Sequence, residues 1–153
     1  MADQELQKEK YPLSIEHMVV RDGRVEALVC VHDKGCRFTN EALISYCVKR
    51  CPSLPEHACK NPRGKTFAAV MNHTSLAHLL EHLVIDFQMR SLNEQSCKDD
   101  VYLMGTTELF PDDSLRARVV VSYYDDLVCL AAFKEACAFL NEYLIKGEAR
   151  FVV

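Results

Sequence analysis

The sequence predicts an α+β domain in which an antiparallel sheet of about four or five strands has about three helices packed on one face. Two observations predict this class. Pairs of β-rich segments are joined by turns of hairpin length, which implies antiparallel pairing, and three other segments have apolar residues at helical spacing. A chain of 153 residues is long enough to build one core. We therefore expect a polar N-terminal tail over residues 1–12 and a single domain over residues 13–153.

Two hairpins are expected in the sheet. Residues 15–21 and 24–32 are rich in β-formers and flank an Asp-Gly pair, which is the strongest short hairpin signal. Residues 101–107 and 117–124 are a second β-rich pair, with a turn at Pro111 between them. A short apolar run before the central helix leaves room for a fifth strand.

Three segments predict helices. The first is expected to begin after Thr39 and to stop before Pro52. The second can be capped by the Thr or Ser at positions 74–75 and runs to about residue 90 without Gly or Pro. The third covers residues 127–145 and is expected to end at Gly147. The connection between the first two helices is long, and long connections inside compact domains often carry function.

Composition and charge exclude several classes of protein. Apolar residues make up 49% and charged residues 26%, as in globular proteins rather than disordered or fibrous ones. The net charge is −4 and no basic stripe is present, so nucleic acid is not expected as a partner. No segment has the 18 or so consecutive apolar residues of a membrane span, and the N-terminus does not resemble an export signal. A cytoplasmic protein without a membrane partner is expected.

The eight cysteines are expected to be reduced, because no export signal is seen. Three of them lie in apolar runs and are expected to act as small buried hydrophobes: Cys30, Cys129 and Cys137. Five lie nearer turns and could be thiols or metal ligands: Cys36, Cys47, Cys51, Cys59 and Cys97. No C-x-x-C pair is present, which disfavours a zinc finger and a redox protein.

The central helix carries the pattern H-x-x-E-H at His78, Glu81 and His82. Residues four apart are neighbours on a helix, so two imidazoles can point at one metal ion, with the carboxylate of Glu81 beside them. This is the inverzincin spacing, in which the Glu accepts a proton from the attacking water. The four residues predicted to be buried on the opposite side are Leu79, Leu80, Leu83 and Phe87. A solvated polar helix face is the alternative interpretation.

A catalytic zinc usually has three protein ligands, and the motif supplies two. The candidates for the third are Asp86, one turn beyond His82, and His57, Cys59 or His73 from neighbouring segments. Asp86 could instead orient an imidazole by accepting its distal N–H.

Several short motifs follow one another in a characteristic order: LPEHAC at 54–59, then Phe67 and Thr74, and HLLEHLVIDFQ at 78–88. In this order and spacing the chain resembles the N-terminal domain of cyanophycin synthetases over most of its length. The pattern of that family is L-P-x-H-x-C, a Phe, then a Thr before H-x-x-E-H-x-x-x-E-x-Q, followed by a hairpin and a final helix. The resemblance implies an α+β module that holds an Asp/Arg polymer. In some members of the family the domain also has a zinc-metallopeptidase-like site that cuts the polymer, and the resemblance implies such a site here.

Carried over residue by residue, the resemblance assigns His78 and His82 to the metal and Glu81 to catalysis. Asp86 stands where the family has Glu, one methylene longer, and residues 91–100 lack the family's Gly- and Arg-rich stretch. The function expected is therefore a zinc-dependent peptidase-like or amidohydrolase-like domain acting on a peptide or isopeptide. The alternative is a non-catalytic module that binds a peptide, a polymer or a partner protein.

Overall fold

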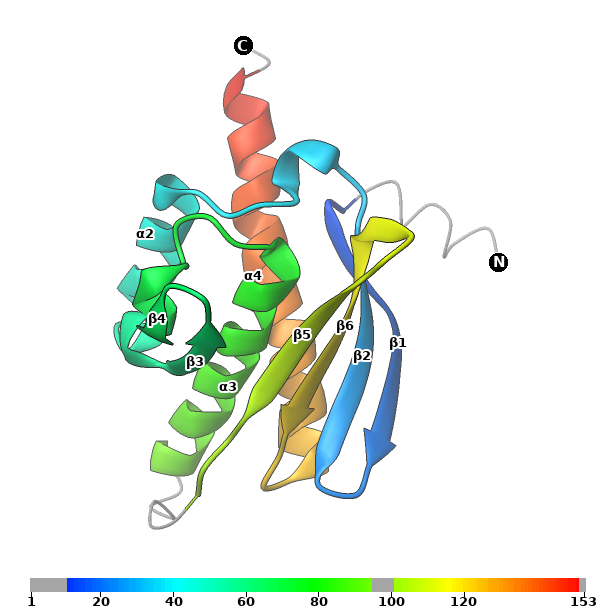
Figure 1. Cartoon of the computed structure of the whole chain (residues 1–153), viewed down its shortest axis with the longest axis vertical. Helices are drawn as coiled ribbons and strands as arrows, with labels where there is room; N and C mark the ends of the chain where they lie inside the picture. Colours follow the sequence, from blue (N-terminus) through cyan, green and yellow to red (C-terminus); the bar gives the residue numbers. More distant parts are fainter. Residues whose placement is uncertain (1–10, 95–100, 152–153) are drawn as a thin grey trace.

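The computed structural model describes the backbone of residues 11–94 and 101–151, which fold as the predicted α+β domain. A four-stranded antiparallel sheet has the order β1-β2-β6-β5, and the helices cover one of its faces (Figure 1). Helix α3 lies over β5 and β6, whereas α4 lies over β1 and β2. The predicted tail falls almost entirely outside the described residues.

Both predicted hairpins are present. The first joins β1 (Leu13–Arg21) to β2 (Arg24–Val31) through a two-residue turn, in which Gly23 takes the positive φ of 80° that such a turn requires. The second joins β5 (Gly105–Phe110) to β6 (Asp113–Ser122), and β6 pairs with β2 to unite the sheet. Strand β5 begins and ends later than the predicted range, and a two-residue turn joins it to β6.

The sequence predicts that helix α2 (Glu41–Arg50) begins after Thr39, but the residue that caps it is Asn40. The Asn40 side-chain oxygen accepts the N–H of Leu43 at 2.9 Å. The Thr39 hydroxyl is engaged elsewhere, since it donates to the carbonyl of Met71 at 2.7 Å and accepts the N–H of Thr74 at 2.9 Å. Thr39 thereby ties this segment to the start of the central helix.

The central helix α3 (Leu76–Glu94) begins where the sequence predicts, and the Ser75 hydroxyl accepts the N–H of His78 at 3.2 Å. The last helix, α4 (Asp126–Phe151), starts behind Asp125, whose carboxylate accepts two backbone N–H groups. The prediction that Gly147 ends this helix is wrong. A glycine within a helix costs only about 1 kcal/mol relative to alanine, and the helical backbone continues past it.

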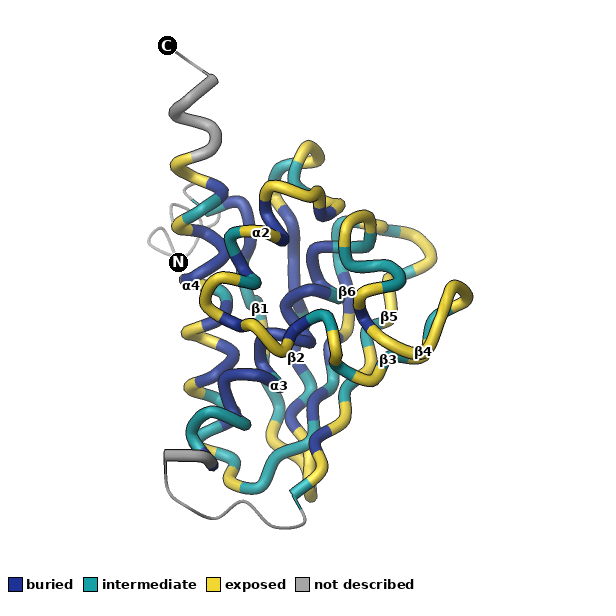
Figure 2. Tube along the Cα trace, turned by 90° about the vertical axis from the view of Figure 1, so that its left-hand side faces the viewer, coloured by how far each residue is buried: buried dark blue, intermediate teal, exposed yellow. Residues whose placement is uncertain are grey.

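The core lies between the helix layer and the sheet, and Figure 2 shows it as a buried interior with exposed turns around it. The predicted apolar side of α3 is confirmed as buried, at Leu79, Leu80, Leu83 and Phe87. The sheet contributes alternate residues, among them Val25, Val29, Val119 and Val121. Within residues 11–94 and 101–151, no helix is long and apolar enough to cross a membrane.

The burial of the cysteines differs in part from the prediction. Cys47 and Cys51 are fully buried in the core, and burial raises the pKa of the Cys47 thiol to about 12. Cys30 and Cys129 are buried as expected, whereas Cys137 is only partly buried. Cys97 lies outside the described residues.

The long connection after α2 contains structure that the sequence did not predict. After a single 3-10 turn (Leu54–Glu56), the chain forms a second, two-stranded sheet from β3 (Ala58–Asn61) and β4 (Gly64–Thr66). Asn61 shapes its turn by accepting the N–H groups of Arg63 and Gly64 at 2.9 and 2.8 Å. We call residues 58–66 the β3–β4 hairpin.

Truncating Leu83 to Ala is expected to lower the free energy of unfolding by about 2–5 kcal/mol, because the side chain is fully buried and its loss leaves a cavity. Chemical denaturation measures this effect. Leu127→Ala is the matched control, because Leu127 is exposed and should change stability by less than about 0.5 kcal/mol. Equal effects of the two substitutions would contradict the packing described above.

Candidate metal centre

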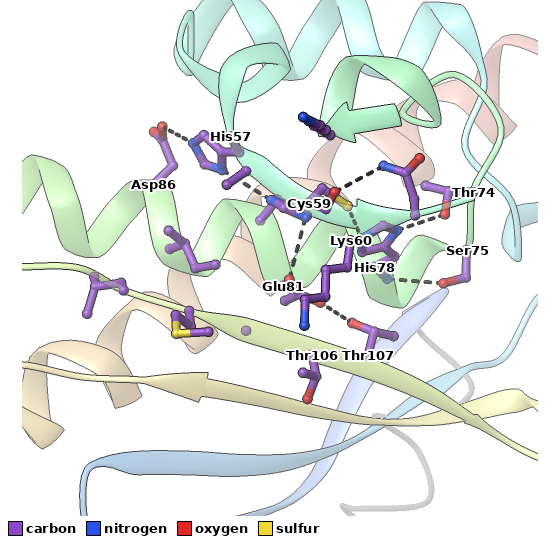
Figure 3. A pocket seen from close by; sticks show the side chains of 18 of the residues that line it. His57, Cys59, Lys60, Thr74, Ser75, His78, Glu81, Asp86, Thr106 and Thr107 are labelled. Carbon is purple, nitrogen blue, oxygen red and sulfur yellow. Dashed lines mark hydrogen bonds and ion pairs between the residues drawn. The ribbon is translucent and has the colours of Figure 1, made fainter. Parts of the chain in front are cut away.

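Helix α3 and the β3–β4 hairpin bring three potential metal ligands together (Figure 3). One side-chain donor atom from each of Cys59, His78 and His82 lies within 4.8 Å of the other two. The Sγ atom of Cys59 lies 3.4 Å from Nε2 of His78. A thiol and two imidazoles at this separation could hold a metal ion.

Thr74 and Phe67 fix the ring of His78. The Thr74 hydroxyl lies 2.9 Å from Nδ1 of His78, and the Phe67 ring packs edge-on against the imidazole with centroids 5.1 Å apart. With Nδ1 occupied in this way, Nε2 is the nitrogen that faces Cys59. Thr74 is therefore an outer partner of the kind that orients metal-binding histidines.

His82 is almost completely buried and lies against Phe67, with ring centroids 4.1 Å apart. Its Nδ1 lies 3.2 Å from Nδ1 of His57. Its Nε2 is buried without a hydrogen-bond partner among the described residues, and the nearest carboxylate oxygen, Oε2 of Glu81, lies 3.5 Å away. A buried polar atom without a partner costs free energy, and such atoms are rare in folded proteins. A metal ion in this position would satisfy Nε2.

Asp86 and His57 form a chain that ends at His82. Nε2 of His57 lies 3.3 Å from Oδ1 of Asp86, which also accepts the Ser53 hydroxyl at 2.8 Å. When both rings are neutral, His57 donates from Nε2 to Asp86 and accepts at Nδ1 from His82, which leaves a lone pair on Nε2 of His82. This is the tautomer that a metal requires.

The structure thus brings Cys59 to the two histidines of the motif and leaves Asp86 outside this group. Asp86 is held by Ser53, by His57 and by Arg90, whose Nε lies 3.3 Å from Oδ2. Burial raises the pKa of Asp86, but the hydrogen bonds from His57, Ser53 and Cys51 outweigh burial and hold the pKa below its usual range. An ionised Asp86 suits the orienting role that the sequence left open.

The electrostatics of the two histidines favour metal binding. Burial lowers the pKa of His82 to about 3, helped by the nearby rings of His78 and His57, and burial also lowers the pKa of His78. Both rings are therefore neutral at pH 7, the form that coordinates metals. Burial raises the pKa of Cys59, so a bound metal ion would have to displace the thiol proton.

Glu81 lies beside this group and is itself buried. Burial raises the pKa of Glu81 to about 7, against a hydrogen bond from Thr107 that lowers it. The Thr107 hydroxyl donates to Oε1 at 2.8 Å, and Oε2 lies 3.5 Å from Nε2 of His82. A carboxylate with a pKa near 7 is suited to accept and release protons at neutral pH.

Strand β5 supplies two residues that the sequence analysis missed. Thr107 fixes Glu81, and Gly105 makes room for it, because a Cβ atom at position 105 would lie 2.7 Å from Cγ of Glu81. No sequence signal links β5 to α3, since the two segments meet only through the tertiary fold. His73, an early candidate ligand, instead stacks on Phe38 with ring centroids 4.9 Å apart.

The candidate metal centre opens into a groove of about 1330 Å³. Helix α3 forms its floor, the β3–β4 hairpin forms one wall and the segment leading into β5 forms the other. His78, Glu81 and His82 all line it, so both histidines border a concavity. A molecule in the groove can therefore reach the ligand group and Glu81 together.

Comparison of the chain with models of known protein families, with curated proteins and with solved structures found no match. The resemblance to the cyanophycin synthetase domain therefore depends on the order and spacing of residues in this sequence alone. The geometry itself supports a group of residues that could hold a metal ion, next to a buried carboxylate in an open groove.

Proposed function

We propose that this chain is a zinc-dependent, peptidase-like or amidohydrolase-like hydrolase that acts on a peptide or isopeptide. The observation that carries the proposal is the position of Glu81, a buried carboxylate with a pKa of about 7, beside Cys59, His78 and His82. Zinc is favoured because imidazole and thiolate are its preferred ligands. Three protein ligands also leave a fourth position open, as catalytic zinc sites do.

Several residues have separate roles in the proposed hydrolysis. When bound, zinc would polarise a carbonyl group and lower the pKa of a water molecule. Glu81 accepts the proton of the attacking water and returns it to the leaving amine. Thr107 holds one carboxylate oxygen, so the other faces His82 and the groove. The chain from Asp86 through His57 keeps His82 in its metal-binding tautomer.

A second function fits the same groove, namely a metal-stabilised module that binds a peptide or polymer without cutting it. Its support is the size of the groove together with the resemblance to a polymer-holding domain. If the wild-type protein binds zinc but cleaves none of a broad panel of peptides, including Asp/Arg isopeptides, the binding module is favoured over the hydrolase.

The metal is tested by elemental analysis of protein purified without a metal-affinity tag. About one equivalent of zinc is expected, and Cys59→Ser should weaken its retention against a chelator because a serine hydroxyl is a poorer zinc ligand than a thiolate. Cys36→Ser is the matched control, since Cys36 lies outside the ligand group and should leave the zinc content unchanged. The proposal is contradicted if the wild-type protein is purified without metal and added zinc does not change its thermal stability.

A further inference from the structure

Strand β5 is an edge of the main sheet and runs along the groove. The N–H of Ser122 donates to the carbonyl of Met104 at 2.8 Å, so Met104 directs its backbone toward β6. Residues of an antiparallel strand alternate in this respect. The backbone N–H and C=O groups of Gly105, Thr107 and Leu109 therefore face the free edge, where none of the described strands pairs with them.

The segment leading into β5 and the strand itself also expose apolar side chains. Tyr102 is 71% exposed, Met104 61% and Leu109 41%, and all three line the groove. Large apolar side chains are seldom exposed together unless they contact another molecule. The groove, at about 1330 Å³, exceeds the roughly 300–1,000 Å³ of small-molecule pockets. A groove of this volume with a free strand edge along it can accommodate an extended chain.

The opposite wall is basic. The β3–β4 hairpin exposes Lys60, Arg63 and Lys65 and contains no acidic residue, and both lysines line the groove. Figure 3 shows Lys60 extending from β3 into it. Among the side chains that the structure describes, no carboxylate forms an ion pair with any of the three. This charge is available to a ligand.

We propose that the groove binds an extended acidic peptide, which pairs as an added strand with β5 and places carboxylates near Lys60 and Lys65. Gly105 and Thr107 contact Glu81, so a strand added here passes the metal centre. Cleavage of the peptide rests on the proposed function, whereas its binding does not. Charge complementarity selects the acidic peptide over a neutral or basic one.

The test is calorimetric titration of zinc-treated Glu81→Gln protein, which should leave the peptide uncut. The probe is a blocked decapeptide of alternating Thr and Glu, compared with the same peptide carrying Gln or Lys in place of Glu. We expect the Glu peptide to bind at least about tenfold more tightly than the Gln peptide, and less tightly as salt is raised. Equal affinity for the three peptides would overturn the proposal.

Backbone pairing is tested with two Glu peptides that are N-methylated at alternate residues, one at the Thr and one at the Glu positions. An added strand bonds to the edge through one alternate set of residues, so one methylated peptide should lose at least about tenfold in affinity and the other should not. Retained affinity of both would show binding through side chains alone and would overturn the pairing with β5.

Charge is tested on the full chain with the double substitution Lys60→Glu and Lys65→Glu. Affinity for the Glu peptide should fall at least about tenfold, whereas Lys49→Glu with Lys134→Glu, the same charge change on α2 and α4, should have little effect. If the protein binds the Glu peptide selectively but hydrolyses no peptide, this proposal is retained and the hydrolase is rejected. Equal binding and hydrolysis of Glu, Gln and Lys peptides would reject this proposal and retain the hydrolase.

Discussion

Replacing Glu81 with Gln is expected to lower the rate of peptide or isopeptide hydrolysis by about 10²–10⁴-fold while zinc remains bound. Gln keeps the shape of the side chain and can still accept the hydrogen bond from Thr107. It cannot accept a proton from water, so the loss should appear in kcat. Zinc content and hydrolysis are measured on the same preparation.

Glu142→Gln is the control, because Glu142 is exposed on α4, where it pairs with Lys146, and does not line the groove. It removes the same charge and should leave hydrolysis unchanged. If Glu81→Gln turns over substrate as fast as the wild type, Glu81 is not the base and the mechanism is wrong. If Glu81→Gln also loses zinc, the carboxylate has a role in holding the metal.

Replacing His78 with Ala is expected to weaken zinc binding by more than about 100-fold and to abolish hydrolysis, because one of the three proposed protein ligands is lost. His57→Ala should have a smaller effect, about 10–100-fold, as is typical when an outer partner of a metal-binding histidine is removed. The dissociation constant measured in competition with a chelator distinguishes the two effects.

The matched control is His17→Ala, because His17 is exposed on β1 and lies outside the ligand group. It should leave the zinc affinity unchanged. An unchanged affinity in His78→Ala would remove His78 from the ligand set. A loss in His57→Ala as large as that in His78→Ala would make His57 a ligand in its own right and contradict the orienting chain described above.

The sequence predicted the elements whose signals are local. The Asp-Gly turn located the first hairpin, and the helical spacing of Leu79, Leu80 and Leu83 located both faces of α3. The prediction at Gly147 was wrong because a glycine marks the end of a helix only where the backbone leaves the helical conformation after it. Here helix α4 continues to Phe151.

The third potential ligand could not be chosen from sequence for a different reason. Asp86 has the favourable spacing of one more helical turn, but Ser53 and His57 already engage its carboxylate. Cys59 reaches His78 only because the connection after α2 folds into the β3–β4 hairpin, whose strands are too short and too polar to give a period-two signal. The roles of Gly105 and Thr107 likewise depend on a contact between distant segments.

The position of Cys59 on the β3–β4 hairpin would link metal affinity to the position of this wall of the groove. A two-stranded hairpin is only marginally stable by itself, so part of the free energy of metal binding would be used to hold this wall against α3. Coupling of this kind is reciprocal. A ligand that spans from Lys60 to β5 would brace the same wall, so each ligand would bind more tightly in the presence of the other. Metal and substrate would then act as heterotropic effectors of each other through Cys59 and Lys60, two neighbouring residues of β3.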